Sequence, residues 1–161
     1  MSDEKNEKEI INLAVSINKR GEILMIRRAK EEIGKGDVKL TWAFPGGRQR
    51  SSETPEQCVR RETLDETGYA INPFLRISSR THPQFDVFVI YHLCPLASQE
   101  SVDKPNQPHE IAEIRWVKPE TVLKLVTTDL DPSIKQLLEL LKSGSEETLF
   151  GKITPDSSKT P

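Results

Sequence analysis

Cysteine is scarce in this sequence of 161 residues, which contains only Cys58 and Cys94. Two cysteines cannot build the disulfide framework on which small secreted domains rely. Long apolar runs are missing too, since no segment approaches the roughly 18 consecutive apolar residues of a membrane-spanning helix. The first nine residues, MSDEKNEKE, are polar and acidic, whereas a secretory signal is basic and then apolar. These absences predict a cytoplasmic protein with no membrane partner.

An excess of positive charge is also missing. The chain carries 23 Lys and Arg residues against 25 Asp and Glu residues, so its formal net charge is −2. Proteins that bind nucleic-acid polymers usually present a basic face, because much of their affinity comes from neutralising phosphates. No nucleic-acid polymer is therefore predicted as a partner, and a polyanionic ligand would need metal ions or a few local arginines. The sequence assigns no oligomeric state.

The composition is that of a globular domain. Apolar residues make up 35% and charged residues 30% of the chain, which is close to the average for folded proteins. The length suits one domain with a sizeable core. We expect this domain to cover residues 10–143, after a flexible N-terminus at residues 1–9. Residues 144–161 offer little to bury and should form a disordered or loosely docked tail.

Hydrophobic patterning predicts strands interspersed with helices. Residues 10–17 and 23–26 are rich in β-branched and apolar side chains and are predicted to form a hairpin around the turn residues 18–21. Residues 27–40 are charged and contain two glycines, which indicates an exposed loop. Further strands are expected at residues 71–79, 85–93 and 114–117, and helices at residues 55–67, 119–126 and 132–141. This order predicts an α/β domain with a mixed sheet covered on both sides.

The helix at residues 55–67 has clear signals at both ends. Thr54 is a typical N-cap residue, Pro55 suits the first helical position, and Gln57 can complete a capping box. Gly68 is the residue type that most often follows the end of a helix. The sequence therefore predicts a helix of about three and a half turns at this place.

Three acidic side chains share one face of this helix. Glu62, Asp65 and Glu66 are spaced i, i+3 and i+4, which brings their carboxylates together. Like charges at this spacing repel, and the C-terminal end of a helix dipole disfavours negative charge. A bound divalent cation would relieve both effects, and Mg²⁺ prefers such hard oxygen ligands. The alternative is a solvated acidic face supported by Arg60 and Arg61.

A longer pattern surrounds these acids. The segment GGRQRSSETPEQCVRRETLDETGY resembles the signature of the Nudix hydrolases, G-x5-E-x7-R-E-U-x-E-E-x-G-U, in which U is a bulky aliphatic residue. Thr63 and Tyr69 depart from it by replacing aliphatic residues. Asp65 departs from it by replacing a glutamate, which keeps the charge but shortens the reach by one methylene group. The resemblance extends over about residues 10–141 and implies the Nudix fold, an α/β/α sandwich with a mixed β-sheet.

The resemblance also implies a metal site. By their positions in the motif, Glu62 and Glu66 would be the main ligands of Mg²⁺, with Mn²⁺ as the alternative ion. Asp65 would be a further ligand or would lie behind the ligands, and the carbonyl of Gly47 would supply another oxygen. In the family, such a site promotes the attack of water on a phosphorus atom of a diphosphate.

Further catalytic roles follow from the same resemblance. Glu53 would pair with Arg61 and orient the site. Two residues are candidates for the general base, Glu62 first and Glu110 second. Glu110 stands six residues before Trp116, as an acid does in MutT-type members, and would then also contribute to metal binding. An ordinary loop acid is the alternative for Glu110.

Substrate contacts are expected outside the helix. Arg28 resembles a residue that contacts polar groups of the substrate in MutT-like members, and the alternative is a surface arginine at the end of a strand. Phe44 matches a position beside the base pocket, and Trp42 could supply a stacking face. Gly46 and Gly47 would bring the backbone close to the substrate.

Together these features predict a Mg²⁺-dependent hydrolase that binds a nucleotide. The substrate would be a nucleoside triphosphate or a nucleoside diphosphate linked to another group, and a nucleoside monophosphate would be released. Two alternatives stay open. One is an ADP-ribose or sugar-nucleotide pyrophosphatase, and the other is a Nudix-like module that binds a nucleotide without cleaving it.

Overall fold

The computed structural model describes residues 7–106 and 109–143. In these ranges the strands are β1 (Glu9–Val15), β2 (Ile23–Ile33), β3 (Lys39–Ala43), β4 (Gly46–Arg48), β5 (Leu75–Thr81), β6 (Val87–Leu93) and β7 (Ile111–Val117). The helices are the short 3₁₀ turn η1 (Lys35–Asp37), α2 (Pro55–Thr67), α3 (Pro119–Leu125) and α4 (Pro132–Lys142). Most of the N-terminal segment that was expected to be flexible, residues 1–6, and the whole expected tail at residues 144–161 lie outside the described residues.

The strands form two sheets. The first has the order β4-β1-β6-β5 and is mixed, because β1 and β6 run parallel while the other neighbours are antiparallel. The second has the order β3-β2-β7 and is antiparallel. The α/β expectation is confirmed, with the strands divided between a mixed sheet and a smaller antiparallel one.

The hairpin predicted for residues 10–17 and 23–26 is wrong. The turn itself forms, since the side chain of Asn18 accepts hydrogen bonds from the amides of Arg20 and Glu22. Both edges of β1 are occupied by β4 and β6, however, so β2 leaves for the other sheet. Only an isolated bridge between Ile17 and Ile23 joins the two strands. The turn chemistry was visible in the sequence, and the competition for the strand edges was not.

The loop predicted for residues 27–40 is also wrong. Strand β2 continues to Ile33, and β3 returns from Lys39 after the turn η1. The outer half of β2 is exposed to solvent and carries charged residues on both faces. Such a strand lacks the apolar alternation by which strands are recognised. Strand β4 at Gly46–Arg48 was not predicted either. The other elements lie within a few residues of their predicted bounds, the largest shift being the start of β5 at Leu75.

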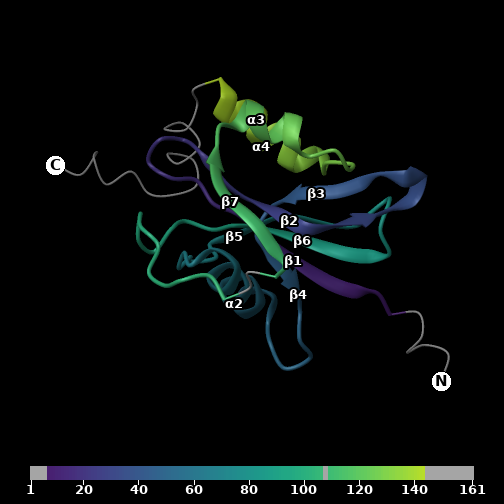
Figure 1. Ribbon diagram of the computed structural model, residues 1–161, viewed down its shortest axis with the longest axis horizontal. Helices are drawn as coiled ribbons and strands as arrows, with labels where there is room; N and C mark the ends of the chain where they lie inside the picture. The colour runs from purple at the N-terminus through teal and green to yellow at the C-terminus, as the bar shows by residue number, and fades with distance from the viewer. Residues whose placement is uncertain (1–6, 107–108, 144–161) are drawn as a thin grey trace.

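Two apolar layers hold the elements together. Figure 1 shows α3 and α4 on one side of the strands and α2 on the other. The larger core lies between the sheets and beneath α3 and α4, with Met25, Tyr91 and Leu138 among its buried members. The smaller core joins α2 to the outer face of β1 through Val59 and Ala14. This arrangement is the predicted α/β/α sandwich.

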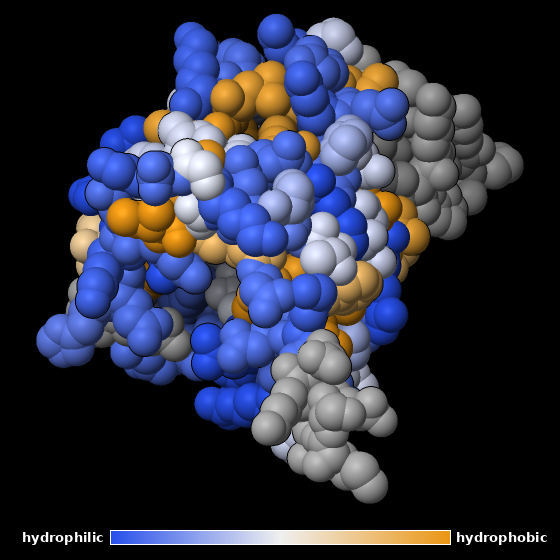
Figure 2. All heavy atoms as spheres, turned by 90° about the vertical axis from the view of Figure 1, so that its right-hand side faces the viewer, coloured by the Kyte–Doolittle hydropathy of each residue, from blue (hydrophilic) through white to orange (hydrophobic). Residues whose placement is uncertain are grey.

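The surface matches the composition. The face shown in Figure 2 is largely hydrophilic, with apolar side chains in small groups. None of the described helices is long and apolar enough to cross a membrane.

Candidate active site

Helix α2 begins and ends where its capping residues predict. The amide of Gln57 donates to the Thr54 hydroxyl at 3.1 Å, and the amide of Thr54 donates to the Gln57 side chain at 2.9 Å. Gly68 follows the helix in the left-handed conformation, with φ of 78°. Because both ends are fixed, the acidic face of α2 has a defined orientation beside β4.

Two glycines on β4 allow this helix to come close. The Gly46 amide donates to Oε1 of Glu66 at 2.8 Å. Gly46 has φ of 146°, and a Cβ at this position would lie 1.9 Å from the carbonyl oxygen of Asn12. A Cβ on Gly47 would lie 2.8 Å from Cδ of Glu62. The glycines therefore let two carboxylates of α2 reach the edge of the sheet.

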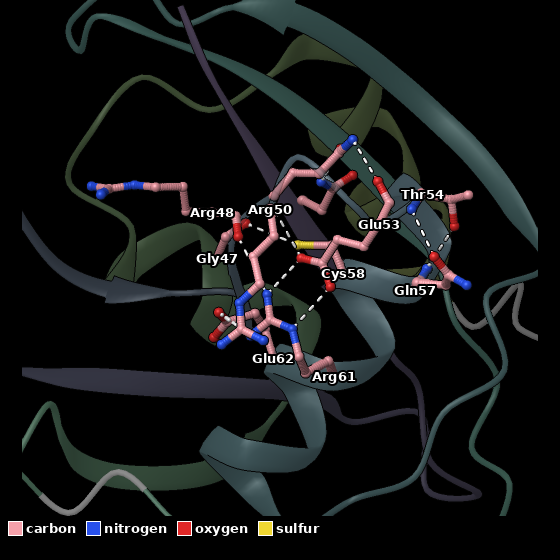
Figure 3. A network of polar contacts seen from close by, with 11 residues as sticks. Gly47, Arg48, Arg50, Glu53, Thr54, Gln57, Cys58, Arg61 and Glu62 are labelled. Carbon is pink, nitrogen blue, oxygen red and sulfur yellow. Dashed lines mark hydrogen bonds and ion pairs between the residues drawn. The ribbon is translucent and has the colours of Figure 1, made fainter.

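Arg61 joins two acids of the motif (Figure 3). Its guanidinium donates to both carboxylate oxygens of Glu53, at 3.0 and 2.6 Å, and to Oε1 of Glu62 at 2.8 Å. The Arg61 hydrogen bonds are the main reason that the pKa of Glu53 falls to about 2. The expected pair of Glu53 and Arg61 is present, and the same guanidinium fixes one carboxylate oxygen of Glu62.

A cleft of about 470 Å³ opens beside this network and is lined by Glu62, Glu66 and Glu110. Sheet pairing explains how Glu110 arrives there, since its carbonyl accepts a hydrogen bond from the amide of Ala29 on β2. Glu66 is only 6% exposed. Burial first, and then the charges of Glu62 and Glu110, raise the pKa of Glu66 to about 8 against the opposing effects of the Gly46 amide and of Arg28. Glu66 therefore resists ionisation beside the other two acids, and a cation bound at this place would favour its carboxylate form.

The donor chemistry of this region fits a hard divalent cation. Carboxylates of Glu62, Glu66 and Glu110 and the carbonyl of Gly47 offer oxygen ligands of the kind that Mg²⁺ prefers. Within the described ranges, no three acidic, histidine or cysteine side chains are grouped tightly enough to hold a metal as they stand. The ion pair of Glu62 with Arg61 directs one of its oxygens to the guanidinium.

Asp65 is the acid that the structure does not bring to the cleft. Its carboxylate is not among the lining groups. Its backbone carbonyl instead accepts a hydrogen bond of 2.7 Å from the amide of Asn106. The carbonyl of Gly68, directly after α2, also accepts hydrogen bonds from the amides of Val102 and Asp103. The loop that leads to Glu110 is thus attached to the end of the helix.

The residues expected to contact substrate all line the same cleft, namely Arg28, Trp42, Phe44, Gly46 and Gly47. Phe44 is 4% exposed and packs edge-to-face on Tyr91 with ring centroids 6.1 Å apart, so it lies at the floor of the cleft. Trp42 is half-buried, and the Arg115 guanidinium lies 5.0 Å from its ring centre.

Sequence reasoning missed the opposite end of the cleft. His82, Phe85 and Asp129 line that end, and Tyr91 lines the cleft beside Phe44. They come from β6, from the loop before β6 and from the loop between α3 and α4. No local motif marks these positions, because they meet only when both sheets and the C-terminal helices have formed.

Of the two departures that replace aliphatic residues of the motif, Tyr69 has a structural explanation and Thr63 has none. Tyr69 packs edge-to-face on Trp116 at 5.2 Å between ring centroids, and the indole N–H donates to its hydroxyl at 3.0 Å. The tyrosine thereby links the end of α2 to β7, which an aliphatic residue could not do by hydrogen bonding. Thr63 is fully buried, and its hydroxyl has no hydrogen-bond partner among the residues described.

Comparison with known proteins agrees with this geometry. The family model described as NUDIX domain matches residues 11–141. A putative 8-oxo-dGTP diphosphatase of Bacillus subtilis (strain 168) is 27% identical over 134 residues, which cover 83% of this chain and 79% of that protein. An ADP-ribose pyrophosphatase of the same organism is 27% identical over 118 residues, covering 70% of this chain and 60% of that protein.

A third relative matches over a shorter region. The mRNA-decapping enzyme subunit 2 of Arabidopsis thaliana is 29% identical over 83 residues, or 51% of this chain and 22% of that protein. The chain therefore spans about a fifth of the length of this relative.

Among solved structures, the MutT protein from Methanosarcina mazei Go1 superposes with a TM-score of 0.60 at 23% identity, covering 86% of this chain and 95% of that one. At this identity the superposition establishes the fold.

Proposed function

The chain belongs to the NUDIX domain family, and on this premise we propose that it is a Mg²⁺-dependent hydrolase of the pyrophosphate linkage in a nucleoside triphosphate or a related nucleoside diphosphate compound. The observation that carries the proposal is the convergence of Glu62, Glu66 and Glu110 on one cleft that also has aromatic walls. A nucleoside phosphate combines these two requirements, since it is anionic at one end and flat and partly apolar at the other.

The metal ion would be held by the carboxylates of Glu62, Glu66 and Glu110 and by the carbonyl of Gly47, with Asp65 outside this set. A bound divalent ion neutralises phosphate charge and makes water more acidic. Mn²⁺ could take the place of Mg²⁺, because it also accepts hard oxygen ligands.

The protein's own groups would prepare the reaction. Arg61 fixes the direction of Glu62, and the Gly46 amide fixes that of Glu66. Arg28 would neutralise part of the phosphate charge from the opposite wall of the cleft. In the reaction, the water oxygen forms a bond to phosphorus and the bond from phosphorus to the bridging oxygen breaks. Glu62 or Glu110 would accept the proton of the water.

The identity of the substrate is the finer part of the proposal. Relatives at the same level of identity include a putative 8-oxo-dGTP diphosphatase and an ADP-ribose pyrophosphatase. We favour a nucleoside triphosphate, releasing a nucleoside monophosphate and pyrophosphate, and treat ADP-ribose and sugar nucleotides as the alternative substrates. One panel of these compounds, with product analysis, separates the two classes.

The test is turnover of that panel with Mg²⁺ by the wild type and two variants of the same helix. We expect Glu66→Gln to lose about a hundredfold or more in kcat/KM, because a charged ligand of the cleft is removed. Asp65→Asn is the matched control and should stay within about threefold, since this side chain does not line the cleft. Nucleotide binding without turnover, with either Mg²⁺ or Mn²⁺, would instead identify a non-cleaving module.

A further inference from the structure

A buried asparagine lies on the face of β1 that α2 covers. Asn12 is fully buried, and Ala14, two residues further along the strand, packs against Val59 of α2. Side chains two residues apart share one face of a strand. Burying an amide side chain costs free energy unless its hydrogen bonds are satisfied. An apolar residue would be the simpler choice at this position, so the hydrogen bonds of Asn12 need an explanation.

The side chain of Asn12 is the centre of three consecutive hydrogen bonds. Its Oδ1 lies 2.8 Å from Nε2 of His92 on β6, and its Nδ2 donates to Oε1 of Gln49 at 2.9 Å. Nε2 of Gln49 donates in turn to the backbone carbonyl of Glu53 at 3.1 Å. We call these four groups the Asn12 network. It connects an inner strand of the mixed sheet to the acid that pairs with Arg61.

The direction of every hydrogen bond in the Asn12 network is fixed by its last member. The Glu53 carbonyl can only accept, so Gln49 must present its amino group to this carbonyl and its oxygen to Asn12. Asn12 must then present its amino group to Gln49 and its oxygen to His92. His92 is therefore required to carry a proton on Nε2.

The Asn12 network supports a loop that has little other means of support. Residues 51–52, at the tip of the loop between β4 and α2, are exposed, and exposed loops have few packing contacts to fix them. Glu53 is held at both ends, since its carboxylate accepts from Arg61 and its carbonyl accepts from Gln49. Arg61 also donates to Glu62, which lines the cleft. A shift of the Glu53 backbone would therefore pass through Arg61 to Glu62.

We propose that Asn12 and Gln49 are positioning residues for the hydrolytic site and act through the backbone of Glu53. With that backbone in place, Arg61 can direct Glu62 to the cleft. Neither Asn12 nor Gln49 is among the described residues that line the cleft, so their effect does not depend on touching the substrate. A misplacement of about 1 Å can lower a rate about a hundredfold. The catalytic part of this inference rests on the proposed function, whereas the Asn12 network can be tested without turnover.

The first measurement is the tautomer of His92, read from the ¹⁵N resonances of its ring in the absence of metal and nucleotide. The Asn12 network requires the neutral imidazole to carry its proton on Nε2. The carboxylate of Glu56 favours the other tautomer, because its Oε2 lies 3.8 Å from Nδ1. A neutral ring protonated at Nδ1 would overturn the inference, since the network would then run in the opposite direction and turn the oxygen of Gln49 toward the Glu53 carbonyl.

The second measurement compares Gln49→Met with the wild type. Methionine keeps the length of the side chain and removes both hydrogen bonds, and position 49 is only half-buried, so the variant should fold. Exchange of the Arg61 Nε–H with water should become about fivefold faster, the factor that corresponds to one lost hydrogen bond. In the hydrolysis assay kcat should fall about tenfold and KM should stay within about threefold, because no substrate contact is removed. Asn12→Leu should show the same effects, and if it does not fold, Gln49→Met decides.

Ser78→Ala is the matched control. The Ser78 hydroxyl donates to the buried carboxylate of Asp131 at 2.7 Å, on the edge of the sheet opposite to β4. This variant also loses a side-chain hydrogen bond, yet it should leave Arg61 exchange and kcat within about twofold. An equal effect in Ser78→Ala would show that general stability is responsible and would contradict the inference.

Unchanged kcat in Gln49→Met would overturn the positioning role, and so would a rise in KM at constant kcat, which would indicate a substrate contact. If the wild type hydrolyses none of the nucleotides, the proposed function fails. The two NMR measurements still decide the Asn12 network in that case, because unchanged Arg61 exchange in Gln49→Met would show that the network does not hold the loop.

Discussion

The carboxylate of Glu66 and the backbone amide of Gly46 are joined by a hydrogen bond of 2.8 Å. This bond connects the last turn of α2 to the edge strand β4 and points the carboxylate at the cleft. It exists only because position 46 has no side chain. The geometry of the site therefore depends on backbone at least as much as on the acids themselves.

The two neighbouring glycines should respond differently to the same substitution. Gly46→Ala should cost about 2 to 4 kcal/mol of unfolding free energy, because φ is 146° and the new Cβ would meet the backbone of Asn12. Gly47→Ala meets only the end of the Glu62 side chain, which can move. It should change stability by less than about 1 kcal/mol and lower kcat/KM tenfold or more. Urea unfolding and turnover measure both effects, and full activity in Gly47→Ala would show that the position of Glu62 is unimportant.

The buried hydroxyl of Thr63 should cost stability. Thr63→Val keeps the shape and removes a polar group that has no partner among the described residues, so we expect a gain of about 1 kcal/mol. Thr67→Val is the control, because its hydroxyl donates to the Thr63 carbonyl at 2.6 Å and accepts from the Tyr69 amide. That variant should lose about 1 to 2 kcal/mol. Equal effects of the two substitutions in chemical denaturation would refute this assignment.

Stability should depend on pH through His92. Its Nε2 lies 2.8 Å from Oδ1 of buried Asn12, and burial lowers the pKa of the imidazole below its ordinary 6.5 against the weaker opposing effect of Glu56. Below about pH 6.5 the imidazole therefore takes up a proton in the unfolded chain but not yet in the folded chain. The contribution of His92 to the free energy of unfolding is fully present above pH 6.5 and falls as the pH decreases, by at most about 1.4 kcal/mol per pH unit.

The measurement for His92 compares denaturation at pH 7.5 and pH 5.5 in the wild type and in His92→Gln. Glutamine can donate to Asn12 but does not titrate. The variant should lose less stability between these two conditions than the wild type, whatever its absolute stability. A parallel decline in both proteins would mean that other groups cause the dependence.

Local chemistry was sufficient to predict α2 and its acidic face. Thr54, Pro55, Gln57 and Gly68 act within a few residues of the helix ends, so their effect can be read without knowing the rest of the fold. The resemblance to a family added residues that local patterns could not connect. Arg28 and Glu110 are distant in sequence and meet because β2 pairs with β7.

Non-local pairing was what the sequence concealed. Whether β1 pairs with β2 depends on which strands compete for its edges, and β4 and β6 occupy both. The same limit applied to Asp129, which reaches the cleft through the packing of the loop between α3 and α4 against β5. Spacing alone also placed Asp65 with Glu62 and Glu66, whereas the sheet edge admits only the latter two to the cleft.

Binding of Mn²⁺, followed by the loss of the free-ion signal in electron paramagnetic resonance, tests the central claim most directly. The wild type and Asp65→Asn should bind Mn²⁺ with affinities within about threefold of each other. Glu66→Gln should bind it at least about tenfold more weakly, because a carboxylate facing the cleft has been neutralised. Equal binding by the wild type and Glu66→Gln, or a loss confined to Asp65→Asn, would contradict the assignment of the metal to the cleft between β4 and α2.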